Sequence, residues 1–401
     1  MKLLLATNHL GLGGSESYLL TVAEQLDRLG HEVAIYAPEP GEGAGIAREM
    51  GIPVLDEGGL GGLDGDYDAS LVQDAGVSLQ IADRCPGLPQ LFVAHSAKFD
   101  LQAPPQLDGV VSKIVALNDR VAQRMRSYSS KVDVVRLRQP IDIERFAPRG
   151  ELPERPRTAL LLSNTPSEDR LEMLRRACVT VGLELARLGG PSGHATDVRP
   201  AIAAADVVIG YGRSILEGMA MGRAAFVYDW KGGNGWVTAE TYEAIEADGI
   251  AGGAAVDAIG IDRLGEQLRR YVPSMGPINH DLVAMHHRAN VHAQELVALF
   301  DVLAQPSPHP RGPLQEMARL VRLEWRSRLE NFGLAHENAQ LRQRLRESEA
   351  QAAAAREQAA HQEERVEDLR QSFESSASWR LTRPVRALAR LRKRFARRRD
   401  S

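Results

Sequence analysis

Segments with the residue content of buried β-strands alternate with helical segments along residues 1–305 of this 401-residue chain. The first unit is a strand at residues 2–8, a glycine-rich turn, a helix at residues 15–29 and a strand at residues 31–37. Strand–helix–strand units of this kind build parallel sheets that helices cover. The alternation therefore predicts an α/β fold with doubly wound parallel sheets.

A proline-rich stretch interrupts this alternation once, at residues 140–156. Prolines at this density favour an extended linker, so we place a domain boundary there. The predicted domains are residues 1–148 and 149–305. Further strands are expected at residues 69–73, 91–94, 113–117, 132–136, 159–162, 183–188, 206–209 and 224–228, and helices at 168–181, 200–205 and 281–304.

The composition is that of an ordinary soluble protein, with 43% hydrophobic and 25% charged residues. Cys85 and Cys178 lie far apart, which argues against a disulfide framework or a zinc site. The apolar start is too short for a signal peptide, and no stretch is apolar over the length of a membrane span. We therefore expect a cytoplasmic protein.

The C-terminal quarter has a different composition. A linker at residues 306–310 precedes a segment up to about residue 373 that is rich in Glu, Gln, Arg and Ala. It predicts a long helix or a coiled coil, residues 306–376 with the linker, whose heptad register is poor around Ala352–Ala355. Self-association through this helix is one expectation.

The last segment, residues 377–401, is strongly basic. Residues 380–399 hold ten Arg or Lys and no acid, whereas the chain without residues 380–401 has a net charge of -13. An apolar stripe of Val385, Leu388, Leu391 and Phe395 predicts a basic amphipathic helix, which suits an anionic membrane surface. A solvated charged end is the alternative; nucleic-acid binding is not expected, because no recognition fold accompanies the arginines.

One stretch predicts an anion site. A buried strand at residues 206–209 runs into a turn with Gly210 and Gly212, and a helix starts at Ser214. Unpaired main-chain N–H groups and the positive end of the helix dipole meet at such a turn. Glu217, one turn further, can accept hydrogen bonds from a ribose. Diphosphate on the turn and ribose on the carboxylate describe a nucleotide-sugar pocket.

This stretch resembles the donor-site signature of retaining GT-B glycosyltransferases of family 4, the group that includes sucrose and mannosyl transferases. Tyr211, Gly212, Glu217 and Gly222 stand at the aromatic, glycine, second-glutamate and closing-glycine positions of the signature. Ile209 stands where the first glutamate is expected. The resemblance implies two Rossmann-like domains that face a cleft, with the acceptor on the first domain and the donor on the second. It also implies retention of configuration without a metal or other cofactor.

Other segments extend the resemblance. The turn at residues 11–14 is similar to a Gly-Gly-x-Glu loop that faces the cleft; it fits a dinucleotide fingerprint poorly, and a packing turn is the alternative. His95, directly after a strand, resembles the family's histidine near the donor sugar and phosphate. Residues 139–148 resemble the segment that closes the first domain.

Besides Ile209, three further positions depart from the family pattern. Asn164 and Asp169 align with the basic pair that grips the diphosphate, and Trp236 replaces an acid in the loop at residues 231–236. Arg213 or Arg170 can restore the missing cation, since a guanidinium matches phosphate geometry. The predicted catalytic residues are His95 and Arg213, and the predicted donor-binding residues are Gly13, Gly14, Asn164, Arg170, Gly212, Ser214, Glu217, Gly232 and Gly233.

No metal site is predicted. Asp64 and Asp66 form an Asp-x-Asp pair, but flanking glycines favour a solvated turn. His286, His287 and His292 lack the spacing of a metal pair and are expected on a solvated helix face.

The resemblance implies a glycosyltransferase that moves a sugar from a nucleotide-sugar to a glycan or lipid-linked acceptor. Basic tails after long helices are similar to those of bacterial surface-polysaccharide transferases, which adds an expected peripheral location on the inner face of the membrane. Two alternatives stay open: a catalytically silent GT-B-like scaffold, and a sugar-nucleotide epimerase of GT-B shape.

Overall fold

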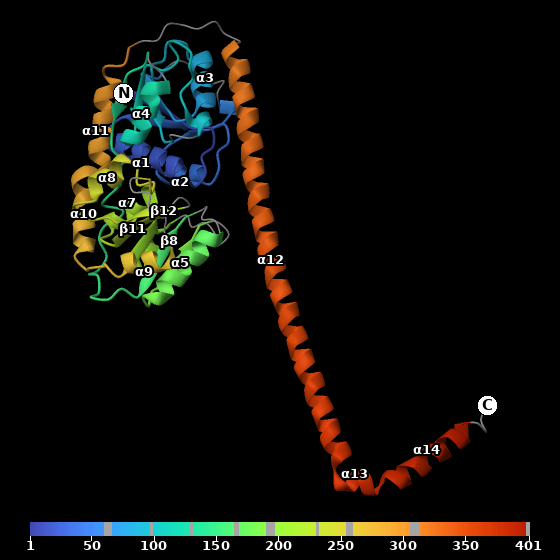
Figure 1. Cartoon of the computed structure of the whole chain (residues 1–401). Coiled ribbons are helices and arrows are strands. Elements are labelled where there is room, and N and C mark those ends of the chain that lie inside the picture. Colours follow the sequence, from blue (N-terminus) through green and yellow to red (C-terminus); the bar gives the residue numbers. More distant parts are fainter. Residues whose placement is uncertain are drawn as a thin grey trace. The chain divides into compact units, whose positions relative to one another are not determined.

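The computed structural model describes residues 1–59, 66–96, 99–128, 131–163, 168–189, 197–229, 232–253, 260–304 and 313–397. It divides into two compact units, Met1–Glu330 and Asn331–Ser401. The first unit holds two α/β domains, each built on its own sheet (Figure 1).

The first domain is a seven-stranded parallel sheet in the order β3-β2-β1-β4-β5-β6-β7. Along the central strand β1, Leu3 and Leu5 enter the core on one face, and Leu4 enters the core on the other. Both faces of this sheet are buried, which explains the unbroken apolar run in the sequence. The elements are β1 (Lys2–Ala6), α1 (Gly14–Arg28), β2 (Glu32–Tyr36), α2 (Gly43–Glu49), β3 (Val54–Leu55), β4 (Ala69–Val72), α3 (Ala75–Arg84), β5 (Gln90–Ala94), the 3-10 turn η2 (Asp100–Gln102), β6 (Lys113–Ala116), α4 (Asp119–Tyr128) and β7 (Val134–Arg136).

The second domain is a five-stranded sheet in the order β12-β11-β10-β8-β9, parallel except for the edge strand β12. Its elements are β8 (Thr158–Leu162), α5 (Glu168–Thr180), β9 (Glu184–Leu188), α6 (Arg199–Ala203), β10 (Val207–Gly210), α7 (Arg213–Ala220), β11 (Ala224–Asp229), β12 (Gly232–Trp236), α8 (Tyr242–Ala247), α9 (Ile261–Leu268) and α10 (Met275–His286), and the helix α11 (Ala289–Phe300) follows them in the sequence. The strands and helices expected from the sequence in both domains are therefore confirmed, with ends that differ by a few residues.

The glycine-rich segment that was expected as a loop is the strand β12 instead. It pairs antiparallel with β11, and a β-carbon at Gly233 would lie 2.1 Å from the carbonyl oxygen of Val227. Trp236 ends the strand in the core, 5.0 Å edge-to-face from the ring of Phe226, and its Nε1 donates to the Gln267 carbonyl at 2.7 Å. Glycine thus permits a close approach of two main chains here.

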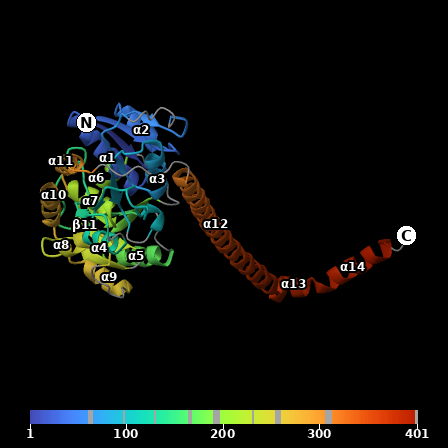
Figure 2. The same ribbon diagram turned by 90° about the horizontal axis from the view of Figure 1, so that it is seen from above.

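The closing helices predicted at residues 281–304 correspond to α10 and α11, which serve different domains. In both views α11 lies beside the first domain and α10 beside the second (Figures 1 and 2). Ala293, Leu296 and Phe300 of α11 belong to the core of the first domain, against α1. This helix was assigned to the second domain from its position in the sequence; its apolar face belongs to the first.

Two of the histidines that were expected on a solvated face are buried at this crossing. His287 is 2% exposed; its Nδ1 donates to the Gln139 carbonyl at 2.7 Å, and its Nε2 lies 2.8 Å from the Tyr242 hydroxyl. His292 is 3% exposed, and its Nε2 lies 2.9 Å from the Tyr18 hydroxyl. Burial lowers the pKa of each imidazole to about 3, so both are neutral. The expectation of a solvated helix face was wrong for His287 and His292, because this part of α10 and α11 packs where the two domains meet.

The long helix expected after the linker is present as α12 (Pro313–Ser375), followed by α13 (Ala377–Leu381) and α14 (Arg383–Arg397). The start of α12 packs on the first domain: Leu314 and Ala318 are buried against Leu79, and Arg326 pairs with Glu39 at 2.7 Å. Among the helices of the described ranges, none combines the length and the apolar character that a membrane crossing requires.

Candidate functional site

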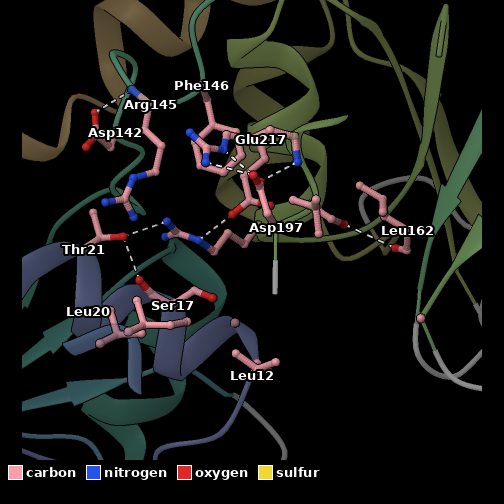
Figure 3. A pocket seen from close by; sticks show the side chains of 18 of the residues that line it. Leu12, Ser17, Leu20, Thr21, Asp142, Arg145, Phe146, Leu162, Asp197 and Glu217 are labelled. Carbon is pink, nitrogen blue, oxygen red and sulfur yellow. Dashed lines mark hydrogen bonds and ion pairs between the residues drawn. The ribbon is translucent and has the colours of Figure 1, made fainter. Parts of the chain in front are cut away.

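A cleft of about 790 Å³ opens between the two domains of the first unit, at the carboxyl ends of their central strands. Open parallel sheets place ligand contacts at this end of their strands. In Figure 3, Ser17 and Thr21 of α1 lie on one side of the cleft, and Glu217 and Asp197 lie on the other. Further lining residues are Gly11, Gly13, Gly14, Ile46, Glu49, Asp142, Arg145, Phe146, Leu162, Ser163, Gly189, Arg199, Tyr211, Gly212, Arg213 and Ser214.

The turn between β10 and α7 is held against β8 by its own main chain. A β-carbon at Gly210 would lie 2.6 Å from the Leu162 carbonyl oxygen, and Gly212 has a φ of 61°, so both positions favour glycine. The Gly212 N–H already donates to the Ile250 carbonyl at 2.9 Å, which removes it from the donors that we expected for an anion. The donors at the start of α7 are therefore the main-chain N–H groups of Arg213 and Ser214.

Arg213 connects three separate segments at the centre of the cleft. Its Nε donates to Glu217 Oε1 at 2.9 Å, its Nη1 to the Pro140 carbonyl at 2.8 Å and its Nη2 to Thr21 Oγ1 at 2.9 Å. Glu217 is on the same helix, Pro140 lies between the domains, and Thr21 belongs to α1 of the first domain. The guanidinium thus ties the second domain to the first.

The Arg213–Glu217 pair is largely shielded from solvent, with side chains that are 9% and 12% exposed. Burial raises the pKa of Glu217, and the charge and hydrogen bond of Arg213 act against that rise. Removing either partner would leave the other as an uncompensated charge inside the protein.

Two further arginines line the cleft and were missed from the sequence. Arg145 donates to Glu24 at 2.8 Å, and Arg199 makes a two-point contact with Asp197 at 2.8 and 2.9 Å. Their side chains are 34% and 45% exposed, far more than that of Arg213. The sequence positions of these arginines could have indicated that they line the cleft. Arg145 lies in the linker between the domains, and Arg199 begins the helix α6 beside the anion turn.

His95 lies next to the cleft, in a smaller hollow of about 270 Å³. Gly14, Gly212 and Arg213 line both spaces, so the hollow adjoins the cleft at these residues. The imidazole Nε2 donates to the side-chain oxygen of Gln73, and the ring meets that of Tyr18 edge-on at 5.0 Å. Burial, with smaller contributions from the charges of Arg213 and His292, lowers the pKa of His95 to about 3. A neutral imidazole can position a polar ligand, but it is a weak base.

The other predicted site residues divide into two groups. Gly13, Gly14, Gly212, Arg213, Ser214 and Glu217 meet in the cleft. Arg170, Gly232 and Gly233 line neither space; Arg170 lies in the first turn of α5, and the two glycines lie on the edge strand β12. Asn164 is outside the described residues, and so is Asp64. Asp66 is on the surface and lies 3.4 Å from the Lys2 ammonium.

Searches against family models and against curated proteins find no match. Solved structures do resemble the chain. HepE of Anabaena in complex with UDP and glucose matches 76% of this chain and 100% of its own length, at 12% identity and a TM-score of 0.54. A glycosyltransferase of Rickettsia africae matches over 75% and 97% of the two chains, at 14% identity and a TM-score of 0.52.

Sucrose-phosphate synthase of Thermosynechococcus elongatus covers 75% of this chain and 98% of its own, at 12% identity and a TM-score of 0.52. In each case nearly the whole neighbour is matched, so the similarity of fold spans both domains. The chain therefore has the GT-B fold, with a long C-terminal helix in addition.

Proposed function

We propose that this protein is a retaining glycosyltransferase that binds a nucleotide-sugar in the interdomain cleft. The observation that carries the proposal is the start of α7, where main-chain donors, a helix N-terminus and the Glu217 carboxylate face one space. A diphosphate fits the N–H groups of Arg213 and Ser214, and a ribose diol fits Glu217. The neighbours solved with UDP or UDP-glucose support this choice of ligand.

The remaining groups of the cleft suit the departure of a charged nucleotide. Arg199 can turn from its exposed partner Asp197 toward a phosphate, because surface ion pairs contribute little free energy, and the charge of Arg145 lies at the same cleft. Fixed donors at the start of α7 stabilise the charge that develops on the leaving diphosphate. This scheme uses no metal and no protein nucleophile, and it gives neutral His95 the role of a hydrogen-bonding contact to the sugar.

The acceptor in this proposal is a glycan or a lipid-linked sugar on the first-domain side of the cleft, as in the synthesis of bacterial surface polysaccharides. The test is release of nucleoside diphosphate from a panel of nucleotide-sugars, with and without lipid-linked or oligosaccharide acceptors. Acceptor-dependent release supports the transferase. Release without transfer favours an epimerase, and no release with any donor contradicts the proposal.

A silent GT-B-like scaffold is the second candidate, and one observation favours it. Ile209, at the position of the first signature glutamate, is fully buried in the core of the second domain. A carboxylate there would be buried with the sheet, so this position offers nothing to a donor in the cleft. If the protein is a catalytically silent scaffold, Arg213 serves only to connect the two domains.

We also propose that the tail places the enzyme on an anionic membrane surface. In α13 and the start of α14, Leu381, Val385 and Leu388 are exposed, and the Arg386 guanidinium stacks over the Trp379 ring at 3.4 Å. The ten basic residues at 380–399 can each contribute about 1 kcal/mol next to anionic lipid. The side chains of Leu391 and Phe395 are outside the described residues, so the full stripe stays a prediction.

Truncation after Ser376 should abolish co-sedimentation with vesicles that contain phosphatidylglycerol, because it removes both the basic and the apolar residues of the tail. A full-length variant with Val385→Ser and Leu388→Ser keeps every charge and should bind more weakly than the natural chain. Equal vesicle binding by the truncated and full-length proteins would refute the membrane proposal.

A further inference from the structure

The helix α12 changes character where it leaves the first unit. Up to Glu330 it packs on the first domain, whereas each described side chain from Asn331 to Ser375 is exposed. Leu334, Leu341 and Leu369 are each more than half exposed. Most helices in proteins owe their stability to packing of an apolar face, and the described side chains of this segment form no such buried face.

The exposed segment carries a heptad pattern that begins at Asn331 and does not extend back to the start of α12. From Asn331 onward, no charged residue occupies an a or d position, although the segment is rich in Arg and Glu. The same frame fails before that point, where Glu324 would occupy an a position. The a positions are Asn331, Asn338, Leu345, Ala352, Ala359, Val366 and Phe373, and the d positions are Leu334, Leu341, Ser348, Ala355, Gln362 and Leu369. The alanine run that seemed to disrupt the register falls within this frame.

The a and d residues form the seam between two helices of a coiled coil. The e and g residues, which flank this seam, indicate which partner fits. In a parallel pair of identical helices, a g residue meets the e residue five positions later on the other chain. These contacts would pair Glu337 with Arg342, and Arg344 with Glu349. One g-to-e contact is like-charged, between Arg365 and Arg370. The Arg370 guanidinium already has Glu374 at 3.3 Å and Glu367 at 3.7 Å on its own helix.

Two features of the seam favour two parallel chains in register. Asn338 lies at an a position, where a buried amide is satisfied best by the same amide of a second chain. Val366 at a with Leu369 at d is the combination that favours two-stranded coiled coils. We propose that residues 331–373 form a parallel, in-register, two-stranded coiled coil with a second copy of this chain. This inference does not depend on the proposed enzymatic activity.

Analytical ultracentrifugation of the full-length protein tests the assembly. The natural chain should sediment with the mass of two chains at micromolar concentration. Leu341→Lys with Leu369→Lys, both on the seam, should give a single-chain mass, whereas Ala350→Lys with Gln371→Lys, both on the outer f positions, should remain a pair. Circular dichroism verifies that the first unit stays folded in both variants. A single-chain mass for the natural protein, or pairing by the seam variant, would overturn the proposal.

Disulfide trapping tests the orientation, because Cys85 and Cys178 are buried and leave an added thiol without a competitor. Val366→Cys, at an a position, should cross-link two chains on mild oxidation, and Glu364→Cys, at an f position, should not. In an antiparallel pair centred on Ala352, the two added thiols would be about 42 Å apart at 1.5 Å per residue. Failure of Val366→Cys to cross-link above the Glu364→Cys control would contradict the parallel register.

Discussion

Arg213→Ala should lower the free energy of unfolding at pH 7 by about 3–5 kcal/mol, the range for breaking a buried ion pair by removal of one partner. The substitution removes the hydrogen bonds to Glu217, the Pro140 carbonyl and Thr21 together, and so cuts the tie between the domains. It also leaves Glu217, whose side chain is 12% exposed, without its cation. Urea unfolding followed by circular dichroism measures the loss.

The loss should depend on pH in a defined direction. Burial already raises the pKa of Glu217, and removal of Arg213 raises it further because the lowering influence disappears. A carboxyl group with a raised pKa in the folded state costs no stability below its unfolded pKa, and the cost grows as the pH rises toward the folded pKa. Arg213→Ala should therefore be less destabilising at pH 4 than at pH 7.

The double variant Arg213→Ala with Glu217→Gln is the matched control, because it removes the unpaired charge as well. At pH 7 it should be more stable than Arg213→Ala alone. Simple addition of the two single effects, with no pH dependence, would show that the pair does not act as a unit.

Glu217→Ala should weaken the binding of a nucleotide by roughly 1.5–3 kcal/mol, about 10- to 150-fold, because hydrogen bonds to a charged group are lost. Arg213 loses its carboxylate partner in this variant, which lowers stability, but its bonds to Pro140 and Thr21 still tie the domains. Isothermal titration with UDP and GDP as probes measures the change.

Glu49→Ala provides the comparison, since Glu49 also lines the cleft but belongs to α2 of the first domain. It should leave nucleotide affinity unchanged. Equal affinities for the natural protein and Glu217→Ala would reject the ribose assignment.

The sequence predicted both sheets because their buried strands are nearly continuous apolar runs between recognisable helices. It missed β12, since Gly232–Trp236 has no strand-like alternation and becomes a strand only by pairing with β11. It also misassigned α11, because an amphipathic pattern shows that a helix is buried but not which core receives it.

The candidate site, like the fold, could be predicted only in part. The turn at Gly210–Gly212 and the start of α7 follow from local sequence, and they lie where we expected them. The three partners of Arg213 come from positions 21, 140 and 217, and no local pattern connects such distant residues. The same holds for Arg145 and Arg199, which reach the cleft only through the arrangement of the domains.

We propose that the cleft at the start of α7 binds a nucleotide-sugar. Isothermal titration of the full-length protein with a panel of uridine, guanosine, adenosine and thymidine diphosphate sugars tests it most directly. We expect saturable binding of at least one donor, at one site per chain, with the affinity reduced about 10- to 150-fold in Glu217→Ala. If no donor binds the folded protein, or if Glu217→Ala leaves binding unchanged, the start of α7 is not a nucleotide-sugar site.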